Sequence, residues 1–435
     1  MSSNSSTASS SSTHSPQSSP HTSPSSIALE LPSPAHRRRC IRSVLMRAGT
    51  SRGLFFRTAD LPEDQSLWGP ILLAAMGSPD PYLRQLDGVG GGTSTTSKVA
   101  VVGPSKDPRA DVDYLFVQVP VDGSRLDFSG NCGNIASGVG PFAVDEGFIK
   151  VPESGKSDVT VRIRNVNTDR IIHSTFEVQD GVPVEIGEMQ LDGVGATGSP
   201  IRLDFVDPAG SMTGKLLPTG SPLDTVTLPS NTSSQPARTF TVSCVDAANP
   251  FVFVDARQLG LTGLESPAEI ASSTTETLMD IRAVCAVHMG LASSHETARQ
   301  VMGTPKIAIV APPMDYSVPA VDGGKRIIRS TDVDIWIRPF SMGRPHPSIQ
   351  MTGAVCVGSA SAVPGTIVHE IISGSRASRM PRANGDEAVI VGHASGTMAI
   401  NGESETIAGH VVVKSGSVYR TARRLMEGSV CCVGC

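Results

Sequence analysis

The stretch DFSGNCGNIASGVG, residues 127–140, decides how the rest of the chain is organised. A strand-like run at residues 114–119 precedes it and small apolar residues end it, so the pattern predicts a loop that leads into a buried helix. Free backbone N–H groups and the positive end of the helix dipole then point at whatever lies over Cys132. A thiol at that place can shift toward the thiolate and act as a base or a nucleophile. The alternative is a small buried cysteine, but a core helix rarely needs amides and glycines at its start.

Length and composition restrict the class of protein. A chain of 435 residues is long enough for two or three domains with well-buried cores, and a hydrophobic content of 39% with 18% charged residues is typical of a soluble globular protein. The formal net charge of −5 gives no general attraction to nucleic acid or to an anionic membrane. No apolar run approaches the length of a membrane span, and no signal-peptide pattern opens the chain. We therefore expect a cytoplasmic protein.

Both ends of the chain are predicted to lie outside the folded part. Residues 1–36 are mostly Ser, Thr, Pro and His, which indicates a disordered leader. Because the leader is Ser-rich and poor in acidic residues, a mitochondrial location is the alternative, although no Arg precedes Arg37. The eight cysteines form no disulfide framework and suit a reducing compartment. The ending CCVGC, residues 431–435, fits neither a zinc site nor a prenylation signal and is predicted to be a frayed tail.

The folded part begins with strands separated by polar turns. The run at residues 41–47, the turn AGTSRG at 48–53 and the run LFF at 54–56 indicate strand, turn and strand. The turn offers two hydroxyls and a guanidinium, from Thr50, Ser51 and Arg52, which together suit a carboxylate. The alternative is that these side chains occur in a hairpin turn by chance.

A Gly- and hydroxyl-rich loop carries a lysine to the start of an apolar strand. After a helix predicted at residues 68–76, residues 86–102 read LDGVGGGTSTTSKVAVV. Neither the Walker loop nor the GxGxxG fingerprint fits this stretch, so no nucleotide site is predicted. A lysine buried at such a place has a lowered pKa and can carry protons. The alternative for Lys98 is a side chain whose stem is buried and whose ammonium reaches water.

The second half of the chain echoes the opening stretch. Glycines and a proline at residues 191–200 mark a plausible boundary, strands follow at 201–205, 251–254, 307–311 and 334–340, and helices are predicted at 267–289 and 294–302. The segment HPSIQMTGAVCVGSA, residues 346–360, again joins a polar loop to a helix of small apolar residues. Because neither helix has a charged face, protein must enclose both. We infer two halves, each a curved sheet around a buried helix, whose helix amino ends face each other across a cleft.

The reactive groups allow proton transfer without a cofactor. The chain contains no HExxH motif, no paired carboxylates, no GxSxG motif and no convincing metal signature, so we predict no metal and no cofactor. A thiol, an amine, hydroxyls, arginines and two helix amino ends could bind a polyanionic organic acid and move a proton. Removal of a proton beside a carboxylate-conjugated double bond creates a dienolate-like charge, which fixed N–H donors would stabilise.

Several motifs together resemble the PrpF family, in collinear order from about residue 40 to residue 428. They are AGTSRG at 48–53, the loop at 90–98, SGNCGN at 129–134, PAGSMTGKLLPTG at 208–220, MTGA at 351–354 and RTARR at 420–424. The resemblance implies an α+β, diaminopimelate-epimerase-like fold of two pseudo-symmetric domains, each a curved, mostly antiparallel sheet around a buried central helix, with the active site in the interdomain cleft. We predict a leader at 1–38, an N-terminal domain at 39–198, a C-terminal domain at 199–428 whose last strands can return to the first domain, and a tail at 429–435.

The resemblance also implies an activity and roles for residues. Members of the family isomerise unsaturated di- and tricarboxylates, and the likeness is nearest to fungal members of itaconate biosynthesis that convert cis-aconitate to trans-aconitate. By resemblance Lys98 is the proton-transferring lysine and Cys132 the cysteine of the SGNCGN loop. Many relatives carry lysine where this chain has Arg52, whose fork suits a bidentate carboxylate. In the epimerases a second cysteine opens the second central helix, where Thr352 stands here, so one-sided allylic proton transfer is favoured over two-thiol racemisation.

The sequence thus predicts a cofactor-independent isomerase that binds a small tricarboxylate, with no nucleic-acid or membrane partner and with a homodimer left open. Alternatives are a 2-methylaconitate isomerase, a 4-oxalomesaconate tautomerase or a non-catalytic carboxylate-binding protein. The predicted catalytic residues are Lys98 and Cys132. The predicted substrate-binding residues are Thr50, Ser51, Arg52, Gly92, Thr93, Ser94, Ser97, Asn131, Gly133, Asn134, Asn249, His346, Met351, Thr352 and Gly353.

Overall fold

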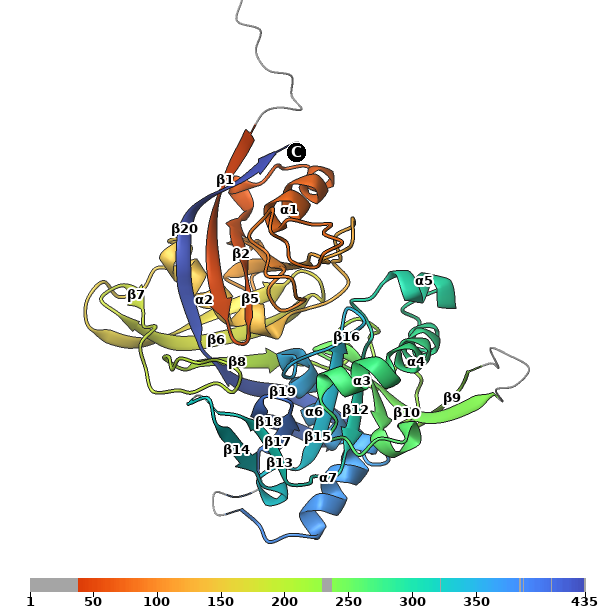
Figure 1. The fold of residues 1–435 in the computed structure, drawn as a ribbon. Coiled ribbons are helices and arrows are strands. Elements are labelled where there is room, and N and C mark those ends of the chain that lie inside the picture. The colour runs from red at the N-terminus through yellow and green to blue at the C-terminus, as the bar shows by residue number, and fades with distance from the viewer. Residues whose placement is uncertain are drawn as a thin grey trace, which may run out of the picture.

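A computed structural model describes residues 38–228, 237–320, 322–382, 385, 387–407 and 409–433, so the predicted leader lies outside the described residues except for Arg38. Figure 1 shows two bodies built mainly from strands. The first contains β1 (Arg38–Ala48), β2 (Ser51–Arg57), β3 (Lys98–Pro104), β4 (Val112–Gln118), β5 (Lys156–Asn165), β6 (Arg170–Gln179), β7 (Val182–Pro183) and β8 (Ile201–Val206), with helices α1 (Trp68–Met76) and α2 (Gly133–Asp145).

The rest of the described chain forms the second body and the two last strands. The second body contains β9 (Asp224–Leu228), β10 (Arg238–Ala247), β11 (Asn249–Asp255), β12 (Lys306–Ala311), β15 (Ile335–Ser341), β16 (Arg344–Pro345), β17 (Val389–His393) and β18 (Gly396–Ile407), and a separate hairpin of β13 (Tyr316–Pro319) and β14 (Lys325–Ile328). Its helices are α3 (Pro267–Ser273), α4 (Thr275–His288), α5 (His295–Gln300), α6 (Met351–Ser361) and α7 (Ile367–Ala377). Strands β19 (His410–Arg420) and β20 (Ala422–Val433) complete the described chain.

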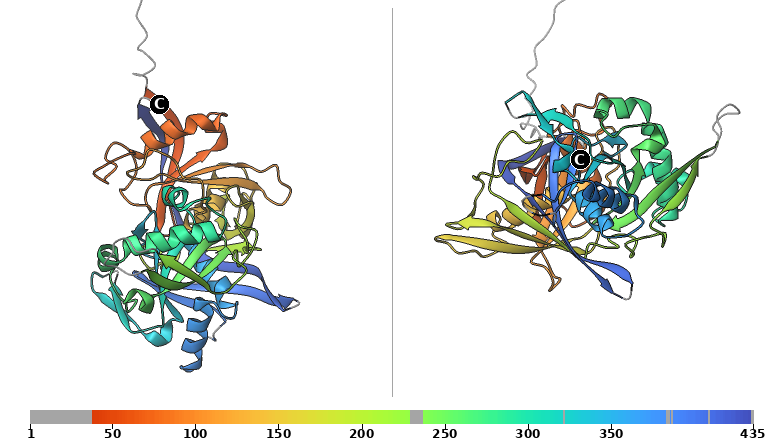
Figure 2. Two further views of the ribbon diagram at one scale, coloured as in Figure 1. Left: turned by 90° about the vertical axis from the view of Figure 1, so that its right-hand side faces the viewer. Right: turned by 90° about the horizontal axis from the view of Figure 1, so that it is seen from below.

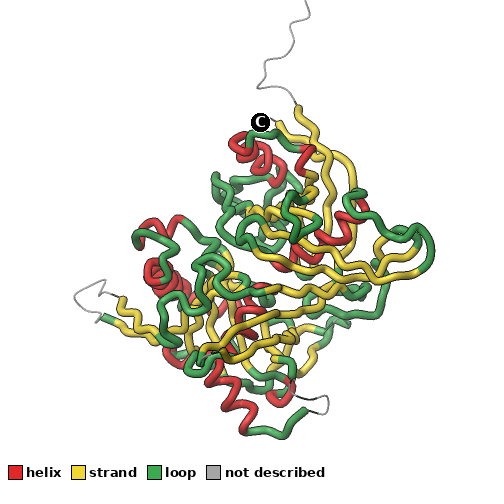
Figure 3. The backbone as a smooth tube through the Cα atoms, turned by 180° about the vertical axis from the view of Figure 1, so that it is seen from behind, coloured by secondary structure: helices red, strands yellow, loops and turns green. Residues whose placement is uncertain are grey.

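Strand pairing is continuous through both bodies. It runs from β20 through β1, β2, β3, β4, β5, β6 and β8 to β19, and onward through β18, β17, β15, β12, β11 and β10 to β9. Seen from behind, the strands pass from one body into the other (Figure 3). The predicted boundary at residues 198/199 separates β6 from β8, although these two strands are hydrogen-bonded to each other.

The two bodies repeat one pattern, as a pseudo-symmetric fold requires. The order β1-β2-β3-β4-β5-β6-β8 in the first matches β10-β11-β12-β15-β17-β18-β19 in the second. In each set the second and third strands are parallel, as are the fourth and fifth, and the other neighbours are antiparallel. Helix α2 connects β4 to β5, and α6 with α7 connects β15 to β17. The α+β class is confirmed.

Each body encloses one helix of small residues. Every residue of α2 from Gly133 to Val144 is buried, and nine of the eleven residues of α6 are buried. Glycines let the surrounding sheet approach closely: a Cβ added at Gly138 would lie 2.9 Å from the Phe55 ring. The absence of charged side chains, which predicts enclosure from the sequence, is therefore matched by the packing.

Most predicted elements form where the sequence places them, with one instructive exception. Helix α1 spans the predicted residues 68–76, whereas the helix predicted at 267–289 is broken at Thr274. The hydroxyls of Ser273 and Thr274 bond back to carbonyls four residues earlier, and Thr274 leaves helical geometry with a φ of −131°. Such side chains compete with helical hydrogen bonding. Among the described helices, none combines the length and apolar character that a membrane crossing requires.

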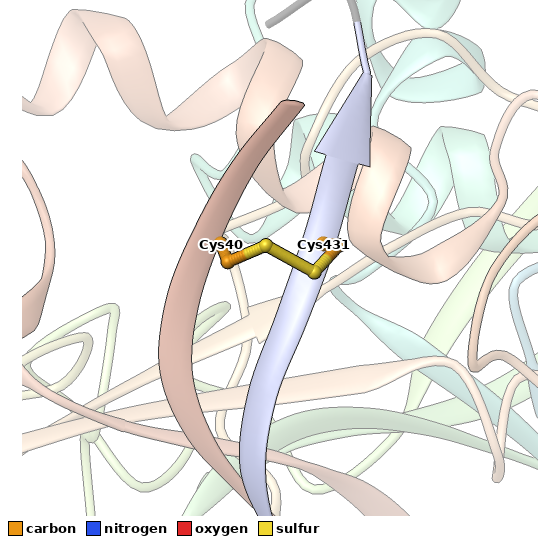
Figure 4. Close-up of a disulfide and its surroundings, with 2 residues drawn as sticks. All are labelled: Cys40 and Cys431. Carbon is orange, nitrogen blue, oxygen red and sulfur yellow. A yellow bond between two sulfur atoms is a disulfide. The ribbon is translucent and has the colours of Figure 1, made fainter. Parts of the chain in front are cut away.

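The end of the chain corrects two expectations. Residues 429–433 are not a frayed tail, because they belong to β20 and pair with residues 38–42 of β1. The cysteines were expected to form no disulfide framework, and two of them, Cys40 and Cys431, are nevertheless bonded at a Cα–Cα distance of 4.1 Å (Figure 4). The antiparallel register sets these residues directly opposite each other, although 391 positions separate them in sequence. Spacing along the chain could not reveal that neighbourhood.

Candidate active site

Lys98 is a buried amine held by a fixed amide. It is the first residue of β3, is 6% exposed, and its Nζ donates to Oε1 of Gln118 at 2.8 Å. The Gln118 Nε2 donates to the carbonyl oxygens of Ser94 and Ser97 at 3.2 and 2.9 Å, which leaves Oε1 to face the lysine. The Nζ also lies 5.0 Å from the centre of the Phe116 ring. The amine is therefore enclosed and oriented, as a proton carrier requires.

The glycine-rich loop before Lys98 is fastened by Gln85. The Gly92 N–H donates to Gln85 Oε1 at 2.9 Å, and Gln85 Nε2 donates to the Ser97 hydroxyl at 2.7 Å. The Ser97 hydroxyl itself donates to the Val119 carbonyl, while the Thr93 hydroxyl bonds those of two neighbouring threonines. The hydroxyls of Ser97 and Thr93 are thus occupied by protein groups, and a substrate contact from either stays a prediction.

This loop borders a cavity shared by the two bodies. The cavity has a volume of about 510 Å³. The first body contributes Gly92, Thr93, Ser94 and Gln118, and the second contributes Arg299, Met302, Met342 and Arg344. In the left view of Figure 2 the first body lies above the second. Because Gln118 also holds Lys98, the amine lies directly behind the wall of this interbody space.

Cys132 stands at the amino end of α2. It is the N-cap residue, half-buried, and its carbonyl accepts from the Tyr114 hydroxyl at 3.2 Å and from the Ala136 N–H at 2.9 Å. No side chain caps α2, so N–H groups of its first turn are left without the usual side-chain acceptor. The local structure predicted for residues 127–140 is confirmed, and the positive end of a buried helix dipole lies beside the thiol.

The turn at residues 49–52 is hydrogen-bonded to the first turn of α2. Asn134 Nδ2 donates to the Thr50 hydroxyl at 3.2 Å, and Arg420 Nε donates to Asn134 Oδ1 at 3.1 Å. Gly49 has a φ of +55°, and a Cβ there would lie 2.3 Å from Asn134 Oδ1, so glycine is required. Burial lowers the pKa of Arg420 to about 10. The sequence motif RTARR contains this arginine, but sequence reasoning missed its contact with Asn134.

The second body brings its own helix end to the same place. The Asn131 N–H donates to Asn249 Oδ1 at 3.4 Å, which links the SGNCGN loop to the start of β11. A Cβ added at Gly133 would lie 2.9 Å from Met351 Cβ, so the first residues of α2 and α6 touch. Helix α6 also has no side-chain cap, and Gln350 is its N-cap residue. The inferred meeting of two helix amino ends is therefore present.

Several buried polar atoms have no partner among the described residues, and four of the donors among them lie on the segments described above. These four donors are Ser51 Oγ, Arg52 Nε, Asn249 Nδ2 and Thr352 Oγ1. They come from three places, the start of β2, the start of β11 and the first turn of α6. A buried polar group without a partner costs free energy, so such groups point to a ligand or ordered water. Sequence reasoning had named all four as substrate-binding residues.

His346 is a buried and uncharged residue. Its backbone N–H donates to the Pro339 carbonyl at 2.8 Å, and its ring Nδ1 accepts from the backbone N–H of Ser348 at 3.1 Å. Burial, with smaller effects from the charges of Lys98 and Lys306, lowers the pKa of His346 to about 3. At neutral pH His346 is therefore a neutral side chain that offers its other ring nitrogen.

Lys306 is the functional candidate that sequence reasoning missed. This half-buried residue opens β12, and its Nζ donates to the Gly303 carbonyl at 3.0 Å. Burial and then the charge of Lys98 lower the pKa of Lys306 to about 8, while Asp127 and Cys132 act in the opposite direction. The charges of both Lys98 and Cys132 thus act on the Lys306 amine. The available signal was that KIAIVA at 306–311 repeats the pattern of KVAVV at 98–102.

Comparison with known proteins finds relatives that match most of the chain. The family model described as PrpF protein matches residues 38–433. The 3-methylitaconate isomerase of Eubacterium barkeri is 40% identical over 395 residues, which cover 90% of this chain and 96% of that protein. The 2-methyl-aconitate isomerase of Shewanella oneidensis is 38% identical over 402 residues, with the same shares of the two chains covered. The 4-oxalomesaconate tautomerase of Pseudomonas putida is 36% identical over 394 residues, again with shares of 90% and 96%.

A solved structure shows the same fold. The crystal structure of a methylitaconate-delta-isomerase superposes with a TM-score of 0.68 at 39% sequence identity, and the match covers 92% of this chain and 96% of that one.

Proposed function

This chain belongs to the PrpF family and is an isomerase, and we propose that it shifts an allylic proton in an unsaturated tricarboxylate, converting cis-aconitate to trans-aconitate. The observation that carries the proposal is the set of four buried donors without a partner among the described residues, on three segments from both bodies, together with one buried amine. Three separate donor groups match the three carboxylates of an aconitate better than the two of a dicarboxylate. Related proteins named for methylitaconate, methyl-aconitate and oxalomesaconate support the chemical class.

Binding would fix the substrate by its carboxylates. Ser51 and Arg52 would hold one carboxylate, Asn249 a second, and Thr352 with the free N–H groups of α6 a third. The free N–H groups at the start of α2 face the same site and would stabilise negative charge where it develops. Because these donors are fixed by the fold, little reorganisation is needed during the reaction.

The reaction is a movement of one proton and one double bond. An amine takes a proton from the CH₂ group of cis-aconitate, and the electron pair of that C–H bond spreads over the double bond into a carboxylate. A proton then adds to the former vinylic carbon, and the double bond moves to the other side with trans geometry. We assign Lys98 as the principal acid and base, with Cys132 beside it as a second proton carrier or a polar contact.

Nuclear magnetic resonance with a panel of acids tests the proposal. The purified protein is incubated with cis-aconitate, trans-aconitate, 2-methylaconitate, methylitaconate and 4-oxalomesaconate, in H₂O and in D₂O. We expect cis- and trans-aconitate to interconvert and to take up deuterium in D₂O. Preference for another acid would replace the substrate, and binding without any deuterium uptake would identify a non-catalytic carboxylate-binding protein.

Removal of Lys98 tests the assigned residue. The variant Lys98→Ala should lose roughly 10²- to 10⁴-fold in kcat, the usual contribution of a positioned acid or base. Lys325→Ala is the matched control, because Lys325 is an exposed lysine on the separate hairpin β13–β14. Full activity of a folded Lys98→Ala variant on every acid of the panel would eliminate the mechanism.

A further inference from the structure

Lys98 and Lys306 occupy equivalent positions in the repeated pattern of strands. Lys98 is the first residue of β3 and pairs with Gly53, the third residue of β2. Lys306 is the first residue of β12 and pairs with Phe251, the third residue of β11. Both pairings are parallel, in the strands that precede the central helix of each body. Each lysine is the counterpart of the other under the pseudo-twofold repeat.

The surroundings of the two lysines repeat as well. A short turn with one residue of positive φ precedes each strand: Gly49, with φ +55°, before β2 and Ala248, with φ +58°, before β11. The first residues of these strands, Ser51 and Asn249, both carry an unpartnered buried donor. A twofold axis that relates two walls of one site places equivalent groups on opposite sides of it. Applied to the two lysines, this symmetry argument predicts that their amines face one site from opposite sides.

Contacts across the boundary hold Lys306 at the site. Its Nζ bonds the Gly303 carbonyl, which lies 3.7 Å from the position of a Cβ added at Gly130, two residues before Cys132. The Thr304 hydroxyl donates to the Ser129 carbonyl at 3.3 Å. Gly303 also lies against Asp127, the residue whose carboxylate accepts from the Ser129 N–H at 2.8 Å. The segment that carries Lys306 is thus packed on the loop that carries the thiol.

We propose that Lys306 is a second catalytic amine on the wall opposite Lys98, and that the substrate loses its proton to one lysine and receives a proton from the other. The proposal rests on the proposed function and deepens it. It replaces one-sided transfer by transfer between two walls, and it leaves Cys132 as a polar contact at the helix end.

The direction of transfer is assigned from Lys306. Lys98 is held in place by its hydrogen bond to Gln118 Oε1 at 2.8 Å. Lys306 bonds a single carbonyl and has the lowered pKa described above, so it more readily supplies a neutral amine. In the conversion of cis-aconitate, Lys306 takes the CH₂ proton and becomes an ammonium, while Lys98 gives a proton to the former vinylic carbon and becomes an amine. Exchange with solvent restores both protonation states.

Two variants separate two-sided from one-sided transfer. With Lys306→Gln, Lys98 can still remove and return the CH₂ proton of trans-aconitate, so we expect deuterium uptake into trans-aconitate without isomerisation. With Lys98→Gln, Lys306 can still act on cis-aconitate, so we expect uptake into cis-aconitate without isomerisation. Each variant should lose roughly 10²- to 10⁴-fold in the rate of isomerisation. Lys325→Gln is the matched control, and thermal unfolding checks that every variant is folded.

The outcomes are distinct. Isomerisation by Lys306→Gln at the wild-type rate overturns the second amine and leaves the proposed function intact. Loss of all exchange with both isomers in a folded Lys306→Gln variant that still binds aconitate assigns Lys306 to positioning and also overturns the proposal. If Lys306→Gln does not fold, Lys306→Met is used with the same readouts. No reaction of the wild-type protein with any acid of the panel overturns the proposed function itself.

Discussion

The Lys306 ammonium has a single described hydrogen-bond acceptor, the Gly303 carbonyl. Burial, followed by the charges of Lys98 and Arg282, lowers the pKa of Lys306 to about 8. A base must be neutral to accept a proton, so the active fraction of Lys306 increases as the pH rises toward and beyond 8. We therefore expect kcat/KM for cis-aconitate to rise with pH and to level off above about 8. The measurement is a pH–rate profile of the wild-type protein, and a profile that falls between pH 6.5 and 8 would contradict the assignment.

The buried Nε of Arg52 has no partner among the described residues, whereas the backbone N–H of Arg52 donates to the Thr95 carbonyl at 2.9 Å. Removal of its guanidinium takes a charge-assisted hydrogen bond from a carboxylate, which is worth about 1.5–3 kcal/mol. Arg52→Ala should therefore raise KM for aconitate by about 10- to 150-fold. Steady-state kinetics measure this change. Arg109→Ala is the control, because Arg109 lies in an exposed ion pair with Asp107 and should leave KM unchanged.

The residues near the reaction show what sequence can reveal and what it cannot. Lys98, Cys132, Ser51, Arg52, Asn249 and Thr352 could be named because each stands in a local pattern of turn, loop or helix start. Lys306 and Gln118 could not be named, because the importance of each depends on Lys98. Gln118 lies 20 positions from Lys98 and Lys306 lies more than a hundred positions from it, and only the fold brings these residues together. The repeat of a lysine before an apolar strand was visible, but it acquires meaning only with the repeated strand order.

Helices α2 and α6 meet at their first residues, and this contact leaves no room for a larger side chain. A methyl group added at Gly133 would lie 2.9 Å from Met351 Cβ and 3.1 Å from the Phe205 ring. Overpacking of this kind typically costs about 1–3 kcal/mol. We expect Gly133→Ala to lower the free energy of unfolding by that amount and to reduce activity, because it separates the two helix ends. Urea unfolding provides the measurement.

Gly69 in α1 supplies the matched control. No atom lies within 4 Å of a Cβ added there, so Gly69→Ala should be neutral or slightly stabilising. Equal stability losses for the two variants would show that the contact between α2 and α6 is not tight. At this scale the sequence identified both buried helices from their lack of a charged face. It missed the break between α3 and α4, where hydroxyl side chains bond back to the helix, and the end of β20, which was predicted to be a frayed tail.

The strands of both bodies form one continuous run of pairing from β20 to β9, and the first and last strands of the described chain, β1 and β20, lie side by side at one end of it. The disulfide between Cys40 and Cys431 fastens β1 to β20 in the first body, away from the space between the bodies (Figure 1; Figure 4). A disulfide limits the conformations of the unfolded chain, and its removal typically costs about 2–5 kcal/mol. Cys40→Ser with Cys431→Ser should therefore lower the free energy of unfolding by about that amount and leave kcat unchanged.

Denaturant unfolding with and without dithiothreitol measures this effect. The reductant should destabilise the wild-type protein and leave the double variant unaffected. Equal stability of the two proteins under oxidising conditions would contradict the prediction. The bond escaped the sequence because a pairing across 391 positions is set by the register of β1 and β20 and not by cysteine spacing.

Arg38 and Val433 face each other on adjacent strands, so a short linker could join them. New ends could then be made elsewhere, for example in the exposed turn between Glu153 and Ser154. The resulting circularly permuted polypeptide would retain every strand neighbour. The order in which the two bodies are synthesised would then change, while the pairing of the strands, and with it the architecture, would stay the same.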